Sequence, residues 1–154
     1  MNAADPNEVL KDEATLQLDA HGNLRHLLTL KGLEKSLLAE ILDDAQQYLT
    51  EPGELPARGR SLVGRSVANL FFEASTRTRA SFDLAGKRLG ADVLNLDVNT
   101  SSRKKGESIL DTIYTLEAMH VDIMVVRDAS AGVPAFIARH VLPHVSVLHA
   151  GESD

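Results

Sequence analysis

The stretch LFFEASTRTRASF, residues 70–82, passes from large apolar side chains to hydroxyl and guanidinium groups. The apolar run over residues 67–72 has the length and composition of a buried β-strand. A helix predicted over residues 75–89 follows, and its first turn carries the side chains of Ser75, Thr76, Arg77 and Thr78. Free N–H groups at a helix N-terminus, the helix dipole and a fork-shaped guanidinium together suit a phosphate group. This junction of strand and helix therefore predicts an anion-binding site.

Strands and helices alternate downstream of this junction. Strands are predicted over residues 91–97, 121–126 and 145–149, with helices between them over residues 106–119 and 134–140. This alternation predicts an α/β fold with a doubly wound parallel sheet, helices on both faces and a single domain. Ligands of such sheets bind at the carboxyl ends of the strands. We expect that edge to carry Ser75, Ser101, Arg127 and His149.

The residues upstream of the junction divide into two parts. Residues 1–20 are acidic and polar, and we expect a flexible N-terminal extension before a domain that spans residues 21–154. Apolar residues recur at helical spacing over residues 33–49, which predicts an amphipathic helix packed against the domain. Residues 59–66, GRSLVGRS, nearly match a nucleotide-binding P-loop, but they precede the strand instead of following it, which argues against such a site.

Composition excludes several classes of protein. The chain has 154 residues, of which 44% are hydrophobic and 25% are charged, as in a folded domain and unlike a disordered one. A net charge of −6 argues against a general nucleic-acid binder, and no apolar run reaches the length of a membrane span. The absence of cysteine fits a cytoplasmic protein, and the six histidines form no metal-ligand pattern. We expect neither a metal nor a cofactor.

Two segments carry a resemblance to a known family. FFEASTRTR, residues 71–79, resembles the carbamoyl-phosphate motif of the aspartate and ornithine carbamoyltransferases. SSRKKGES, residues 101–108, resembles the lysine-bearing loop of the aspartate branch, which the ornithine enzymes lack. The resemblance covers about residues 22–150, the first of the family's two domains. It implies transfer of the carbamoyl group of carbamoyl phosphate to the amine of L-aspartate, which gives N-carbamoyl-L-aspartate and phosphate in pyrimidine biosynthesis.

The same resemblance implies roles for single residues around the strand–helix junction. The residues that would bind the phosphate are Ser75, Thr76, Arg77 and Thr78. Arg77 would also neutralise the charge that grows on the departing phosphate. Thr78 and Arg127 would contact the carbonyl oxygen. No protein nucleophile is needed, because the amine attacks the carbonyl carbon directly.

Residues outside the junction are implied to act between domains or subunits. Ser101 and Lys105 match residues that reach into the site of a neighbouring subunit, which implies a homotrimer with shared active sites. Glu73 is either a charge that favours the helix dipole or an acid that pairs with arginines across the domain interface. Asp128 stands where the family commonly has a histidine, and its negative charge would weaken the attraction of anions nearby.

The family continues beyond the last predicted strand into an aspartate-binding domain that is absent from this chain. We therefore expect a truncated gene product or an isolated domain that binds carbamoyl phosphate weakly and turns over poorly. Two alternatives remain, a non-catalytic assembly subunit and an ornithine carbamoyltransferase. The extension over residues 1–20 is either a solvated tail or a docking arm for a dihydroorotase-like or regulatory subunit.

Overall fold

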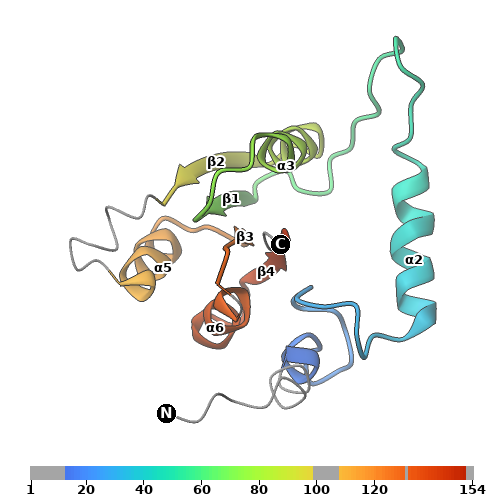
Figure 1. Ribbon diagram of the computed structural model, residues 1–154. Coiled ribbons are helices and arrows are strands. Elements are labelled where there is room, and N and C mark those ends of the chain that lie inside the picture. The colour runs from blue at the N-terminus through green and yellow to red at the C-terminus, as the bar shows by residue number, and fades with distance from the viewer. Residues whose placement is uncertain (1–12, 99–107, 131, 152–154) are drawn as a thin grey trace.

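A parallel four-stranded sheet forms the centre of the computed structural model, which describes residues 13–98, 108–130 and 132–151 (Figure 1). The strands are β1 (Ser66–Phe71), β2 (Asp92–Asp97), β3 (Ile123–Arg127) and β4 (Ser146–His149). Their order is β2-β1-β3-β4, and each neighbouring pair is parallel. The chain reverses its direction across the sheet between β2 and β3, so the predicted doubly wound sheet is confirmed.

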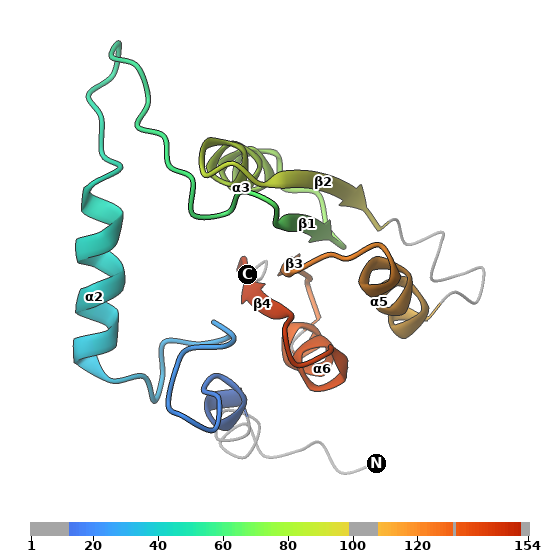
Figure 2. The ribbon, with the colours of Figure 1, turned by 180° about the vertical axis from the view of Figure 1, so that it is seen from behind.

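Within the residues that the structure describes, three helices connect these strands and cover both faces of the sheet. Helix α3 (Thr76–Arg88) lies on one face, whereas α5 (Ile109–Ala118) and α6 (Val133–His140) lie on the other (Figures 1 and 2). Each of these elements was predicted, and the observed ends differ by a few residues. Ser108 begins α5 with a reciprocal capping box, because its hydroxyl accepts from the N–H of Asp111 and the Asp111 carboxylate accepts from the N–H of Ser108.

The face covered by α5 and α6 holds the hydrophobic core. Alternate residues of the strands point toward it, and α5 and α6 contribute their apolar sides. The buried members from these elements include Ala68, Leu70, Met124, Val126, Val147, Ile113, Leu116, Ala135, Ile137 and Ala138. This core fixes β1 and β3 side by side, with Leu70 opposite Val126 and Phe71 opposite Arg127.

The face covered by α3 is held partly by polar contacts. Asn69 of β1 is fully buried and donates from Nδ2 to Oδ1 of Asn95 in β2, at 2.9 Å. Asn95 donates in turn to Oδ1 of Asp83 in α3, also at 2.9 Å. Gly86 brings the helix close to the sheet, because a Cβ atom there would lie 2.8 Å from Cγ2 of Val93. These contacts set the position of α3 and therefore of its N-terminus.

The second part of the predicted flexible extension is packed instead of free. Gln17 is fully buried, and its Oε1 accepts from the N–H groups of Leu28 and Thr29 at 2.7 and 2.9 Å. The following segment pairs with the sheet edge through a parallel bridge between Leu27 and Leu148. Composition alone missed this packing, because a polar residue such as glutamine is buried only where specific backbone partners exist. The first twelve residues of the predicted extension lie outside the described residues.

Helix α2 (Lys35–Gln46) forms where the sequence predicts it, but its predicted packing is wrong. None of its residues is buried, and Leu42 is 70% exposed. Both views show α2 standing apart from the sheet (Figures 1 and 2). Helical spacing of apolar residues predicts which side of a helix prefers contact, but it does not identify the contact partner. In the segments that the structure describes, no helix is both long enough and apolar enough to cross a lipid bilayer.

Candidate functional site

A cavity of about 640 Å³ opens where β1 and β2 end and α3 begins. It lies beside the point at which the sheet changes its winding direction, where open α/β sheets bind ligands. Two predicted phosphate-binding residues, Ser75 and Thr76, belong to its wall together with Glu73. The remaining lining residues are Phe71, Phe72, Ala74, Arg79, Asp97, Val98 and Ala129.

The N-terminus of α3 has the features of an anion-binding helix end. Ser75 is the N-cap residue with extended backbone angles, φ −148° and ψ 92°, and its side chain makes no capping hydrogen bond. The first N–H groups of an α-helix have no acceptor within the helix. The first turn also contains no acidic residue to compete for these donors. An incoming phosphate would therefore meet free backbone donors and a Ser75 hydroxyl that makes no capping bond.

The other two residues predicted to bind the phosphate lie on the first turn of α3 but do not line the cavity. Arg77 is exposed, and Thr78 is partly buried. The Arg77 carbonyl accepts a 2.9 Å hydrogen bond from the Ser81 hydroxyl, which ties the first helical turn to the second. The Arg77 side chain is therefore carried by an ordered helical turn, next in sequence to the lining residue Thr76.

Arg79 and Asp97 form an ion pair in the cavity wall and were not predicted as site residues. Arg79 is the last residue of the quoted motif, and Asp97 is the last residue of β2. The location of Asp97 at a strand end was the available signal, because parallel strands bring their carboxyl ends to one edge. The pair thus places a cation and an anion in direct contact in the wall of this cavity.

Arg127 reaches the site through Glu73. Its Nε donates to Oε1 of Glu73 at 2.6 Å, and its Nη1 donates to the carbonyl oxygen of Ala150 at 3.0 Å. The two side chains are only 20% and 17% exposed, so solvent screens this pair less than a surface pair. The sequence left two roles open for Glu73, a charge that favours the helix dipole and an acid that pairs with arginines across a domain interface. In the structure its partner is an arginine of the same domain.

The remaining predicted residues lie elsewhere. Asp128 is 3% exposed, and its Oδ1 accepts from the N–H of Ser130 at 2.8 Å, so this carboxylate stabilises the turn after β3. His149 lies at the predicted strand end, but its Nδ1 is 3.0 Å from the carbonyl oxygen of Leu28. Ser101 and Lys105 lie outside the described residues.

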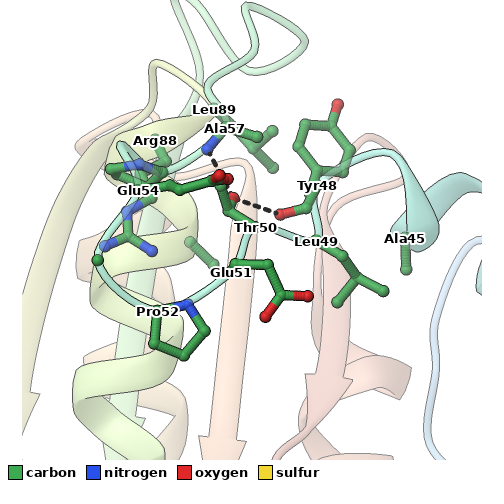
Figure 3. Close-up of a pocket in the computed structure, with 13 residues that line it drawn as sticks. Ala45, Tyr48, Leu49, Thr50, Glu51, Pro52, Glu54, Ala57, Arg88 and Leu89 are labelled. Carbon is green, nitrogen blue, oxygen red and sulfur yellow. Dashed lines mark hydrogen bonds between the residues drawn. The ribbon is translucent and has the colours of Figure 1, made fainter.

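A second cavity, of about 520 Å³, lies at the opposite end of α3 (Figure 3). It is bounded by Tyr48, Leu49 and the loop after α2 on one side, and by Arg88 and Leu89 on the other. Thr50 stabilises this loop, because its hydroxyl accepts from the N–H of Ala57 at 3.2 Å (Figure 3). None of the predicted site residues that the structure describes lines this cavity, so it is separate from the cavity at the start of α3.

A parallel sheet with a polar helix start at its switch point defines the class of α/β proteins that bind phosphate-bearing ligands at their strand ends. Residues 25–154 match the carbamoyl-phosphate-binding domain of the aspartate/ornithine carbamoyltransferases. The chain belongs to this family.

Solved structures of aspartate transcarbamoylases are similar to this chain over one domain. The catalytic subunit from M. jannaschii shares 34% identity over 84% of this chain and 42% of its own, with a TM-score of 0.70. The Trypanosoma cruzi enzyme in complex with carbamoyl aspartate and phosphate shares 33% identity over 83% of this chain and 39% of its own, with a TM-score of 0.66. The chain thus spans about two fifths of the length of these relatives.

Proposed function

We propose that this chain is the carbamoyl-phosphate-binding part of an aspartate carbamoyltransferase. The observation that carries the proposal is the start of α3, where the unused hydroxyl of Ser75 and the free helical N–H groups meet the cavity at the end of β1. Arg127, which the sequence pattern aligns with a carbonyl-contacting arginine, lies on the neighbouring strand and is fixed by Glu73.

The proposed binding mode divides carbamoyl phosphate between two sets of donors. The phosphate dianion lies at the N-terminus of α3, where it accepts from backbone N–H groups, from the hydroxyls of Ser75, Thr76 and Thr78, and from Arg77. The carbonyl oxygen accepts from Thr78 and Arg127. Charge-assisted donors of this kind contribute about 1.5–3 kcal/mol each.

The proposed reaction is a direct transfer. The amine nitrogen of L-aspartate forms a bond to the carbonyl carbon, and the carbonyl oxygen carries negative charge in the tetrahedral intermediate. The bond between that carbon and the bridging phosphate oxygen then breaks, and phosphate leaves with the electron pair and takes up the proton that the nitrogen loses. Arg127 and Thr78 stabilise the oxyanion, and Arg77 stabilises the departing phosphate. Catalysis in this scheme comes from positioning and from charge stabilisation.

The choice of aspartate as acceptor rests on the loop sequence SSRKKGES and on the aspartate transcarbamoylases among the similar structures. Ser101 and Lys105 would enter a neighbouring subunit's site in a homotrimer. The second domain that clamps aspartate would lie outside residues 1–154. A cytoplasmic location and a place in pyrimidine biosynthesis belong to the same proposal. Ornithine as acceptor and a purely structural assembly role are the competing functions.

Replacement of Arg77 tests the anion site directly. Arg77→Ala is expected to weaken binding of carbamoyl phosphate at least tenfold, because one charge-assisted contact of about 1.4 kcal/mol or more is lost. Arg77→Lys is expected to recover part of the affinity, since lysine keeps the charge but not the fork geometry. Arg60→Ala, which removes an equal charge from an exposed loop residue, is the control. Isothermal titration calorimetry measures the affinities, and an unchanged affinity in Arg77→Ala contradicts the proposed site.

Comparison of acceptor analogues tests the rest of the proposal. A bisubstrate analogue that joins a phosphonate to aspartate is expected to raise the melting temperature about as much as carbamoyl phosphate does, because the domain that would clamp aspartate lies outside residues 1–154. A much larger rise with this analogue, and not with one that joins a phosphonate to ornithine, would show that residues 1–154 themselves bind aspartate. If no phosphate-bearing ligand stabilises the folded protein, the assembly role replaces the catalytic one.

A further inference from the structure

The backbone at Gly151 lies directly against the guanidinium of Arg127. A Cβ atom added at Gly151 would lie 2.8 Å from Nη1 of Arg127 and 3.8 Å from its Cζ. The same Nη1 donates to the carbonyl oxygen of the preceding residue, Ala150. The guanidinium therefore occupies the space that any side chain at position 151 would need.

The backbone conformation of Gly151 also favours glycine. Its φ is +100°, in the left-handed region that residues with a Cβ atom rarely adopt. The turn at Gly151 comes directly after the last paired residues of β4. His149 pairs with Val126 of β3, and Ala150 donates its N–H to the Val126 carbonyl oxygen at 2.8 Å. The chain thus leaves β4 beside the end of β3 and turns away at the point where Arg127 projects.

Two fixed bonds leave one end of the guanidinium for a ligand. Nε is engaged by Glu73 and Nη1 by Ala150, whereas Nη2 has no hydrogen-bond partner among the described residues. A side chain at position 151 would displace Nη1 and break the bond to Ala150. Arg127 would then pivot about its remaining bond to Glu73, and the direction of Nη2 would change.

We infer that Gly151 is a positioning residue that sets the direction of the Arg127 guanidinium toward the carbonyl oxygen of the bound substrate. This inference rests on the proposed function, because it assigns Arg127 to the carbonyl group and the start of α3 to the phosphate. It predicts a separation of effects that a general structural role does not produce. Loss of the glycine weakens recognition of the carbamoyl group and leaves recognition of the phosphate intact.

Two ligands separate these contributions. Carbamoyl phosphate carries both groups, whereas methyl phosphate carries the phosphate ester without the carbonyl. The ratio of their affinities, measured by titration calorimetry, reports recognition of the carbamoyl group, to which Arg127 contributes. Gly151→Ala is expected to reduce this ratio about tenfold, the effect of losing one charge-assisted hydrogen bond. Gly151→Asn carries the same Cβ atom but tolerates positive φ better, so it serves as the second variant.

Gly53→Ala is the matched control for backbone strain. Gly53 has a φ of +96°, and no atom of the described residues lies within 4 Å of a Cβ atom placed there. It is expected to lose stability as Gly151→Ala does and to keep the wild-type affinity ratio. In the background of Arg127→Ala, Gly151→Ala is expected to have no further effect on the ratio, because both changes remove the same contact.

The outcomes distinguish this inference from the proposed function. A wild-type ratio in Gly151→Ala or Gly151→Asn overturns the positioning role and leaves the anion site standing. An effect of equal size in the Arg127→Ala background also overturns it, as does failure of both variants to fold while Gly53→Ala folds. Absence of binding of both ligands to the wild-type protein overturns the proposed function, and the inference with it.

Discussion

The two faces of the sheet are built differently. The face under α5 and α6 is a continuous apolar core. Ile113, Leu116 and Ile137 of the helices are buried there, as are Leu70 of β1 and Val126 of β3. The face under α3 has a buried amide, that of Asn69, and the one buried residue of α3 is Gly86. The first face supplies stability, because burial of each large apolar side chain contributes about 1.5–3 kcal/mol. The second face supplies orientation, because directed hydrogen bonds fix the helix whose N-terminus forms the proposed anion site.

The difference between the faces extends to α2. This helix has an apolar side of the same kind as α6, yet Leu42 is exposed and Ile137 is fully buried. An apolar stripe on a helix thus has little effect on stability until another surface covers it. The stability of the described domain is expected to depend on the α5 and α6 face and to be nearly independent of α2.

Truncation of one leucine-sized side chain on each helix tests this contrast and has the largest expected effect. Ile137→Ala is expected to reduce the free energy of unfolding by about 2–5 kcal/mol, because a cavity remains in the core. Leu42→Ala is expected to change it by less than about 0.5 kcal/mol, because its side chain is 70% exposed. Urea denaturation measures both. A comparable loss in Leu42→Ala would show that the apolar side of α2 is covered in solution.

The sequence could predict those features that depend on residues close together in the chain. The order of strands and helices followed from periodicity, because the apolar pattern of each element depends on its own residues. The strand–helix junction at Ser75 was predictable for the same reason, since a cap and its helix are neighbours in sequence.

Contacts between distant residues were not predictable in this way. The bond of Arg127 to Glu73 joins the ends of two strands, and the burial of Gln17 needs the backbone of Leu28. The ion pair of Arg79 with Asp97 depends on the spacing of α3 and β2, which Gly86 sets. A single sequence gives the polarity of these residues but not their partners.

Acid is expected to destabilise the protein at the sheet edge where the segment around His26 contacts β4. Burial, and then the charge of Arg25, lower the pKa of His26 from 6.5 to about 4. Its Nδ1 accepts from the N–H of Val147 at 2.9 Å, so the folded protein favours the neutral ring. The unfolded chain binds a proton below pH 6.5 and the folded chain binds it only near pH 4. Stability is therefore complete above pH 6.5 and falls by up to about 3 kcal/mol as the pH decreases to 4.

The pH dependence is measured by urea denaturation between pH 4 and 7. His26→Gln keeps an acceptor for Val147 but does not titrate, so its stability is expected to vary less over this range. Equal slopes in the variant and the wild type would assign the acid sensitivity to other groups.

The hydrogen bonds that join Asn69, Asn95 and Asp83 on the α3 face give the smallest and most specific prediction. Asn95→Ala is expected to cost about 1–2 kcal/mol, because it leaves the buried Nδ2 of Asn69 without its acceptor. Asn69→Leu is nearly isosteric and removes a buried Oδ1 that has no partner among the described residues, so a change below about 1 kcal/mol is expected. In the double variant the cost of Asn95→Ala should largely disappear, and a urea-unfolding cycle measures this coupling.

The same variants separate stability from orientation. Asn95 donates to Asp83, and this bond, followed by the bond from Lys87, lowers the pKa of Asp83. Asn95→Ala removes the first bond, so the Asp83 pKa should rise and α3 should lose one of its attachments to β2. Asn69→Leu keeps the bond between Asn95 and Asp83 and should therefore keep the affinity for carbamoyl phosphate, whereas Asn95→Ala should weaken it. Equal affinities in the two variants would mean that the polar contacts on this face have no role in forming the proposed anion site.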